Sequence, residues 1–348
     1  MLSETQVKEI REIIENSENP LYFFDCDNDG LASYILLYKK YQKGKGVVVK
    51  GSATLDVAYL RKVEEHNPDL VVVLDKPLIS QDFIDKVHVP IIWLDHHPLS
   101  DVKGVKYYNP RQKYPDLYLP TTYLAYQVAD GEMWVAALGI IGDYAIPDFI
   151  EEFRKKYPDL IGKEKEPGRI IYETEFGKLI RMYNFLLKGK TSDVNKSIAI
   201  LTKIDEPYEL LNKETPRAKY LWKRAEKVEK EYKELLNKAE KWVKKDEILL
   251  FTYPSKKISL SGDLSVELSY RHPDKIIVVG REKSGEIKLS FRSRTKRIDE
   301  PLKKALTGIE GYGGGHEYTC GANIKKEDFT RFIKQFREAI QEQPLRQQ

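Results

Sequence analysis

Four short apolar runs, separated by stretches of helical periodicity, constrain the fold of this 348-residue chain more than any other feature. They cover residues 21–25, 46–49, 70–75 and 90–95, and three of them end in an aspartate, namely Asp25, Asp75 and Asp95. Alternating strand and helix patterns predict an α/β fold with a parallel sheet and helices on its faces. Ligands of such sheets bind beyond the carboxyl ends of the strands, where these aspartates fall.

A long helix is predicted from Thr215-Pro216, because a capping residue followed by proline is a good helix start. Its apolar positions step by three and four residues, as in a heptad repeat: Ala218, Leu221, Ala225, Val228, Tyr232, Leu235, Ala239 and Trp242. This seam is typical both of an intramolecular linker helix and of a subunit interface. Residues 148–206 are charged and irregular, and their pattern assigns no fold.

Strand periodicity returns after residue 246 and predicts a second, smaller α/β domain. Its runs are 248–253, 275–279 and 286–292, followed by a glycine-rich turn at 311–315, a strand at 318–324 and a helix at 327–341. We therefore expect three parts: a catalytic domain over 1–147, a helical insertion with the linker helix over 148–245, and a C-terminal domain over 246–348.

Composition limits the class of protein. The net charge is only +4, so the chain does not coat nucleic acid by bulk charge, and any polyanion site must be local. Two cysteines, Cys26 and Cys320, give no disulfide framework and fit a reducing compartment. No apolar run approaches the length of a membrane span, and the N-terminus does not resemble a signal peptide. We expect a cytoplasmic protein without membrane contact.

Three aspartates alternate after the first apolar run, at Asp25, Asp27 and Asp29, and Gly30 follows. Carboxylates this close repel one another unless a cation lies among them. A calcium loop of the EF-hand type requires a glutamate at its twelfth position, but Leu36 occupies that position here. The motif thus indicates either another kind of metal site or a polar turn after a buried strand.

A second group of candidate ligands follows the run at 90–95, in Asp95-His96-His97. Neighbouring histidines at a strand end point apart, so one can bind metal while the other faces substrate. Asp75 and Asp143 are single carboxylates, and each alone is more typical of a helix cap than of a metal ligand. Together these residues supply what two divalent ions about 3.5–4 Å apart require. Imidazole with carboxylate favours Mn²⁺ over Mg²⁺, with Mg²⁺ as the alternative.

In this order, the segments 25–30, 74–75, 95–97 and 142–143 resemble the DHH phosphoesterase superfamily. Phe291-Arg292-Ser293-Arg294 and Gly313-Gly314-Gly315-His316 resemble its DHHA1 substrate-binding domain. The resemblance covers roughly residues 15–147 and 246–340. It places the chain near RecJ-like nucleases and nanoRNases, and the size and helical middle are most similar to the branch of archaeal Hef-associated nucleases.

The resemblance implies two divalent metal ions, with Asp27 on one, Asp29, His96 and Asp143 on the other, and Asp75 on both. Many members carry a histidine at the position of Phe23, and we expect Asp25 to substitute for it. His97 would lie against the reacting phosphate, and Asp95 would orient the site. These three residues, Asp75, Asp95 and His97, are the catalytic candidates.

The candidate substrate-binding residues are Arg292, Ser293, Arg294, Gly313, Gly314, Gly315 and His316. Glycines let phosphate approach the backbone, although a flexible turn needs them as well. Residues 281–304 hold nine Lys/Arg and four Asp/Glu, which fits either a phosphate-binding patch or a solvated face. Two arginines spaced by two on one strand share a face.

By resemblance we expect a metal-dependent phosphodiesterase that hydrolyses single-stranded DNA and RNA from the 3′ end by two-metal catalysis. The alternatives are a nanoRNase or pAp phosphatase, or a cyclic-dinucleotide phosphodiesterase, acting on short substrates. A further alternative is a non-catalytic replication or repair scaffold. The resemblance also implies a helicase or other DNA repair partner, and the heptad seam leaves a homo-oligomer open.

Overall fold

We analysed a computed structural model, which describes residues 1–243, 245–254 and 258–342. The chain forms two compact units, Met1–Glu226 and Lys227–Gln348. The boundary between them lies inside the long helix α13, so the division into 1–147, 148–245 and 246–348 stays a prediction. Among the described helices, none is long and apolar enough to cross a membrane.

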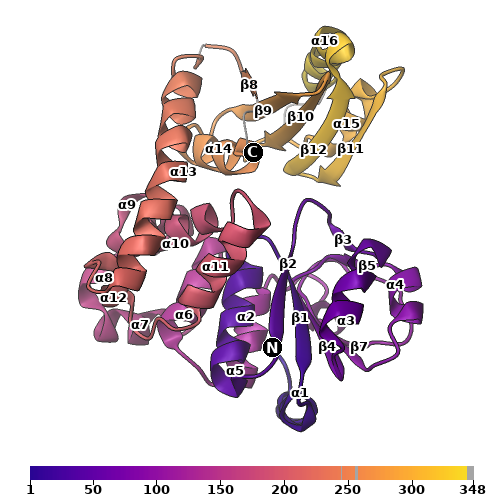
Figure 1. Cartoon of the computed structure of the whole chain (residues 1–348). Helices are drawn as coiled ribbons and strands as arrows, with labels where there is room; N and C mark the ends of the chain where they lie inside the picture. Colours follow the sequence, from indigo (N-terminus) through magenta and orange to yellow (C-terminus); the bar gives the residue numbers. More distant parts are fainter. Residues whose placement is uncertain (244, 255–257, 343–348) are drawn as a thin grey trace. The chain divides into compact units, whose positions relative to one another are not determined.

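The first unit is built around a five-stranded sheet in which every neighbouring pair is parallel, as predicted (Figure 1). Its order is β2-β1-β4-β6-β7, with β1 at Pro20–Asp25, β2 at Lys45–Val49, β4 at Leu70–Leu74, β6 at Ile91–Leu94 and β7 at Lys106–Tyr108. The sequence missed β7, a three-residue edge strand. Two short strands, β3 (Thr54–Leu55) and β5 (Leu78–Ile79), pair separately.

Both faces of this sheet are buried, which explains the continuous apolar strands. Alternate residues such as Phe23, Val73 and Trp93 pack on one face with Phe83 of α4. Residues of the opposite parity, such as Phe24, are equally buried, and α2 and α5 cover that face. The strands that end at Asp25 and Leu74 are therefore fixed from both sides.

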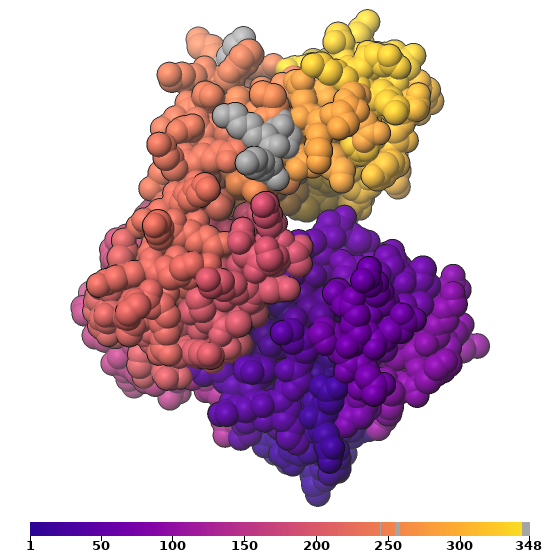
Figure 2. Space-filling model, viewed as in Figure 1, coloured from indigo at the N-terminus to yellow at the C-terminus, as the bar shows by residue number. Residues whose placement is uncertain are grey.

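The helices of this unit account for the charged middle segment that the sequence left unassigned. The helices before this segment are, in chain order, α1 (Glu4–Asn16), α2 (Asn28–Tyr41), η1 (Val57–Tyr59), α3 (Leu60–His66), α4 (Gln81–Lys86), η2 (Pro110–Gln112), α5 (Thr121–Ala129) and α6 (Met133–Gly142). The segment itself folds into α7 (Ile150–Lys156), α8 (Pro158–Ile161), α9 (Pro167–Glu173), α10 (Glu175–Leu186) and α11 (Thr191–Leu201), and α12 (Pro207–Leu211) follows directly. These helices pack against the helices that cover the sheet, and the surface of the segment is continuous with that of the preceding residues (Figure 2).

Helix α13 spans Pro216–Glu240, and Thr215 caps its first turn through the hydroxyl, which accepts a bond from Ala218 N. All but one of the seam residues from Ala218 to Ala239 are buried by the chain itself, which favours the intramolecular interpretation. Two seam positions were wrong. Leu236 is the buried residue in place of Leu235, and Trp242 lies beyond the helix end with 56% of its surface exposed.

The second unit holds a five-stranded sheet of order β11-β12-β10-β9-β8. Its strands are β8 (Ile248–Pro254), β9 (Ile276–Lys283), β10 (Glu286–Arg292), β11 (Gly311–His316) and β12 (Thr319–Lys325), and its other elements are α14 (Ser261–Arg271), α15 (Asp299–Ala305), η3 (Lys326–Asp328) and α16 (Phe329–Gln341). The glycine-rich stretch is thus an exposed edge strand and not the expected turn. It forms a strand because β12 supplies an antiparallel hydrogen-bonding partner.

Candidate metal centre

The loop after β1 turns tightly into α2. Asp27 is the N-cap of α2, and its carboxylate accepts a hydrogen bond of 2.9 Å from Gly30 N. A Cβ on Gly30 would lie 2.6 Å from the backbone oxygen of Asp25, so only glycine fits. The helix start therefore brings the carboxylates of this motif to the carboxyl end of the sheet.

The side chain of Asp29, a residue of α2, reaches the first turn of another helix, α5. Its carboxylate accepts hydrogen bonds from the backbone N–H groups of Thr121 and Thr122, at 2.8 and 2.7 Å. These residues open α5, so the negative charge lies at the positive end of that helix. Asp29 is 1% exposed and its position is fixed before any ligand binds.

Asp75 follows β4 with φ of +57°, a left-handed conformation that is unusual for a residue other than glycine. Its side chain is buried, and Thr121 Oγ1 donates to Asp75 Oδ1 over 3.3 Å. Strained backbone of this kind is often found at functional sites. It directs Asp75 toward the other carboxylates while the next residue, Lys76, is fully buried.

His96 lies among three carboxylates. Its Nε2 atom is 3.3 Å from Asp75 Oδ1, 3.6 Å from Asp143 Oδ2 and 3.8 Å from Asp29 Oδ2. Its Nδ1 atom is buried and has no hydrogen-bond partner within the described residues. His96 is thus placed to offer one ring nitrogen to a cation in the middle of the cluster.

His97 is held by Asp95. Nδ1 of His97 lies 2.7 Å from Asp95 Oδ1, and the His97 backbone N–H donates to Asp95 Oδ2. Asp95 is fully buried and also accepts bonds from the Tyr107 hydroxyl and from Asn109. The imidazole of His97 is 27% exposed, so Asp95 orients a ring that remains accessible.

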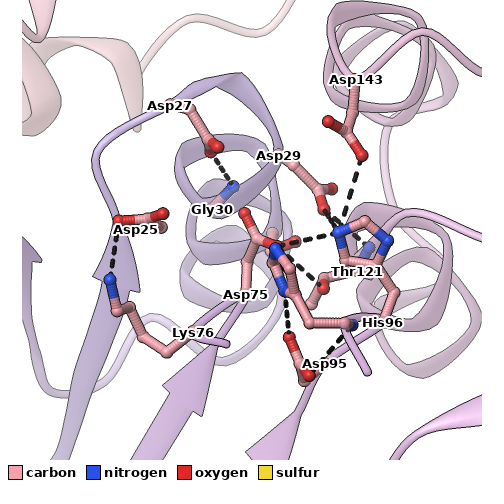
Figure 3. Close-up of polar contacts among 12 residues, drawn as sticks. Asp25, Asp27, Asp29, Gly30, Asp75, Lys76, Asp95, His96, Thr121 and Asp143 are labelled. Atoms are coloured by element: carbon pink, nitrogen blue, oxygen red, sulfur yellow. Dashed lines mark hydrogen bonds and ion pairs between the residues drawn. The ribbon is translucent and has the colours of Figure 1, made fainter. Parts of the chain in front are cut away.

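Potential ligand atoms gather in three overlapping groups. Within each group they lie within 4.8 Å of one another. The groups are Asp25 with Asp27 and Asp75, then Asp75 with His96 and His97, and finally Asp29 with His96 and Asp143. Asp75 joins the first group to the second, and His96 joins the second to the third. Most of these side chains face a common space, whereas Asp25 turns toward Lys76 (Figure 3).

The electrostatics of the cluster favour a cation. Burial and the charges of Asp25 and Asp29 raise the pKa of Asp27 to about 7. Burial and neighbouring carboxylates also raise the pKa of Asp75 and of Asp143. Burial lowers the pKa of His96, so its ring tends to be neutral, as a metal ligand must be. Carboxylate oxygens and one imidazole nitrogen fit divalent ions such as Mn²⁺ and Mg²⁺.

The candidate substrate residues of the second unit lie on neighbouring strands. Arg292 of β10 pairs with Thr319 of β12, which pairs in turn with His316 of β11, so the three form one row across the sheet. Ser293 is buried, and its hydroxyl oxygen accepts from the N–H groups of Thr295 and Lys296. Its hydroxyl therefore stabilises the turn after β10.

Two expectations about this segment need correction. Arg294 does not continue the strand, because β10 ends at Arg292; its guanidinium lies 6.0 Å from the centre of the Tyr270 ring. Gly313, Gly314 and Gly315 belong to the edge strand. A Cβ on Gly315 would lie 2.3 Å from the backbone oxygen of Thr319, so the strand pairing itself requires glycine at this position.

Comparison with known proteins agrees with this architecture. Residues 261–342 match the DHHA1 domain family. The chain has a DHH/DHHA1 fold. No curated protein sequence matches it significantly.

Solved structures extend this DHH/DHHA1 fold over nearly the whole chain. Exonuclease RecJ bound to manganese superposes with a TM-score of 0.67 at 14% identity, covering 99% of this chain and 96% of that one. RecJ of Thermus thermophilus with Mn²⁺ gives a TM-score of 0.69 at 14% identity, covering 99% of this chain, which spans only 56% of that one. A pGpG-specific phosphodiesterase from Vibrio cholerae gives 0.52 at 13%, covering 92% and 98%. These likenesses show the fold.

Some residues around the candidate metal centre were missed from the sequence. Lys76 donates to Asp25, and Tyr118 donates from its hydroxyl to the Asp143 carboxylate over 2.5 Å. Lys76 directly follows Asp75 in the sequence, and this position beside a candidate ligand could have identified it. Tyr118 lies outside the helices and strands and gave none. Phe23, at the position where the family often has histidine, is buried in the sheet core and contacts Phe83.

Proposed function

We propose that this protein is a metal-dependent phosphodiesterase that removes nucleotides from an end of single-stranded DNA or RNA. The observation that carries the proposal is the convergence of Asp27, Asp29, Asp75, Asp143 and His96 on one space beyond the sheet (Figure 3). Phosphodiester hydrolysis by two divalent ions requires this kind of ligand set. The fold shared with RecJ, which was solved with manganese, supports the same reaction class.

Asp25 and Asp27 would hold one ion, and Asp29, His96 and Asp143 the other. Asp75 would contact both, because it belongs both to the group with Asp25 and Asp27 and to a group that contains His96. Bound divalent ions lower the pKa of water and neutralise charge on the phosphate. Mn²⁺ is our first choice and Mg²⁺ the second; RecJ of Thermus thermophilus has been solved with each.

His97 would donate a hydrogen bond from Nε2 to a phosphate oxygen. Its Nδ1–H donates to the Asp95 carboxylate, which fixes the ring orientation, so Nε2 carries a proton to donate when the ring is an imidazolium. The hydrogen bond to Asp95 and the charges of Asp95 and Asp27 outweigh the effect of burial and raise the pKa of His97. A more cationic His97 stabilises negative charge that develops on the phosphate.

The DHHA1 domain would bind the nucleic acid strand through Arg292, Arg294 and His316, with Ser293 and the glycines shaping the surface. Guanidinium groups bind phosphate in a two-pronged geometry, and the row across the sheet supplies Arg292 and His316 together. We assign 3′-to-5′ polarity by the resemblance to Hef-associated nucleases, and that assignment stays a prediction.

A second candidate function is hydrolysis of short substrates such as dinucleotides. The likeness to the pGpG-specific phosphodiesterase, of which 98% is covered, favours it. The proposed metal site would serve both reactions, so substrate length separates them.

The test is hydrolysis of 3-mer and 20-mer single strands of DNA and RNA, labelled at either end, with Mn²⁺ or with EDTA. Stepwise shortening of the 20-mer from its 3′ end is the expected result. Cleavage of the 3-mer alone would establish the short-substrate function. If neither strand is cut with any divalent ion, the protein is not a phosphodiesterase of this kind and a scaffold role takes precedence.

A further inference from the structure

A cavity of about 850 Å³ lies in the first unit beside the candidate metal centre. Its wall includes three tyrosines, Tyr114, Tyr118 and Tyr123, together with aliphatic side chains such as Leu117 and Ile146. Tyr114 and Tyr118 keep 49% and 47% of their surface exposed. The volume falls in the range of roughly 300–1,000 Å³ typical of small-molecule sites.

Tyr118 forms the connection between this cavity and the metal centre. Its hydroxyl donates to the carboxylate and the backbone oxygen of Asp143, at 2.5 and 2.8 Å. Its ring meets His96 edge to face at 5.3 Å. A molecule in the cavity would therefore touch a side chain that itself contacts two candidate metal ligands.

Several polar side chains on the cavity wall are already engaged within the protein. Asn109 binds Asp95 and the His97 backbone, Gln112 donates to Tyr107 O, and Asp148 accepts from the Tyr123 hydroxyl. The cavity consequently offers ring faces and aliphatic carbons more than hydrogen-bonding edges. Lys113, 5.3 Å from the centre of the Tyr114 ring, adds a positive charge at this wall.

We propose that this cavity is a nucleoside subsite that receives the base next to the scissile phosphate, with Tyr114 stacking on it. The inference rests on the proposed function, since a phosphate at the metal centre places an attached nucleoside nearby. Every base has a face that can stack on an aromatic ring, so binding through faces is tolerant of sequence. Tyr118 then acts as a positioning residue between the bound base and Asp143.

Abasic substrates test the subsite. Single strands with the terminal or the penultimate base removed are compared with intact strands in Mn²⁺, using the full chain. Removal of the base that occupies the cavity should lower kcat/KM by roughly 5- to 150-fold, the range that base–aromatic stacking supplies. Tyr114→Ala should cause a similar loss on the intact strand and no further loss on the abasic one.

Two further variants serve as controls. Tyr114→Phe keeps the ring and should restore the dependence on the base. Tyr220→Ala removes a tyrosine of α13 that lies outside the cavity wall, where it contacts Lys196, and should leave both rates unchanged. Equal rates on intact and abasic strands, or an equal loss in Tyr114→Ala on both, would overturn the subsite while the phosphodiesterase proposal stands.

If wild-type protein cuts no strand, binding decides the question separately. A trinucleotide with a terminal 2-aminopurine is titrated with the protein in Ca²⁺, and its fluorescence is measured. Quenching by wild type that is lost in Tyr114→Ala supports the subsite even though the proposed reaction has failed. The same signal from both proteins overturns it.

Discussion

The Nζ atom of Lys76 lies 2.9 Å from Oδ1 of Asp25, and the lysine side chain is fully buried. Lys76 also donates to the backbone oxygen of Ser52 over 2.8 Å. Asp25 is the residue that we expect to replace the ligand missing at Phe23. A buried cation already compensates its charge, so this lysine competes with a metal ion for the same carboxylate.

Replacement of Lys76 tests this competition. Lys76→Met should destabilise the metal-free protein by about 2 kcal/mol, less than the roughly 3–5 kcal/mol of a fully buried pair, because the Asp25 side chain is 29% exposed. Added Mn²⁺ should then raise Tm more in the variant than in the wild type. Lys62→Met, which removes an exposed pair with Glu65, is the matched control. If Mn²⁺ raises Tm by the same amount in Lys76→Met as in the wild type, Lys76 does not limit metal binding.

Asp75→Asn should abolish turnover without loss of the fold. Removal of a carboxylate that serves both ions should cost roughly a thousandfold in kcat, because each ion supplies several kcal/mol of stabilisation. Metal-free Tm should stay equal or rise, since the buried repulsion that raises the pKa of Asp75 is removed. Calorimetric titration with Mn²⁺ should show fewer bound ions; unchanged stoichiometry and near-normal activity would refute the shared-ligand role.

The metal-free protein should lose stability as pH rises. The folded-state pKa of Asp27 is about 7, above its ordinary value of 3.8, so the folded state binds the extra proton between these values. Its stabilising effect is complete below about pH 4 and lost as pH passes 7. In EDTA, Tm should be higher at pH 5 than at pH 8, and Mn²⁺ should reduce the difference. A difference unaffected by Mn²⁺ would mean that other groups cause it.

Asp95→Asn should impair catalysis through His97 while metal binding persists. The substitution weakens the 2.7 Å contact to Nδ1 and permits the ring to turn. We expect kcat to fall about 10- to 100-fold, as for other groups that orient active-site histidines. His97→Ala should lose at least as much, and the double variant should lose little more than His97→Ala alone. Additive losses would show that the two residues act independently.

Arg294→Ala should raise KM and weaken the salt dependence of binding, while kcat changes little. The reason is that Arg294 is assigned to substrate and lies outside the metal cluster. Lys303→Ala, an exposed cation on α15 paired with Glu300, is the control for general charge loss. The same KM and salt slope in both variants would make Arg294 an ordinary surface charge.

Sequence periodicity was sufficient for the fold class and for the main strands of the first sheet. Runs such as 70–74 are apolar throughout because both faces are covered, and this signal is local. The helix start at Thr215-Pro216 was equally readable, and Thr215 caps the first turn of α13 in the structure. Periodicity failed at Gly311–His316, because an exposed glycine strand has no apolar alternation and exists only through its pairing with β12.

The sequence by itself also determined which carboxylates and histidines are candidates, since each follows a strand or ends a helix at a known place. Only the tertiary structure decided how they meet: Asp29 against the N-terminus of α5, Asp143 against Tyr118, and Asp25 against the buried Lys76. Asp29 and Thr121 are separated by 92 positions. Contacts of this range depend on the packing of helices on the sheet, which no local pattern of residues encodes.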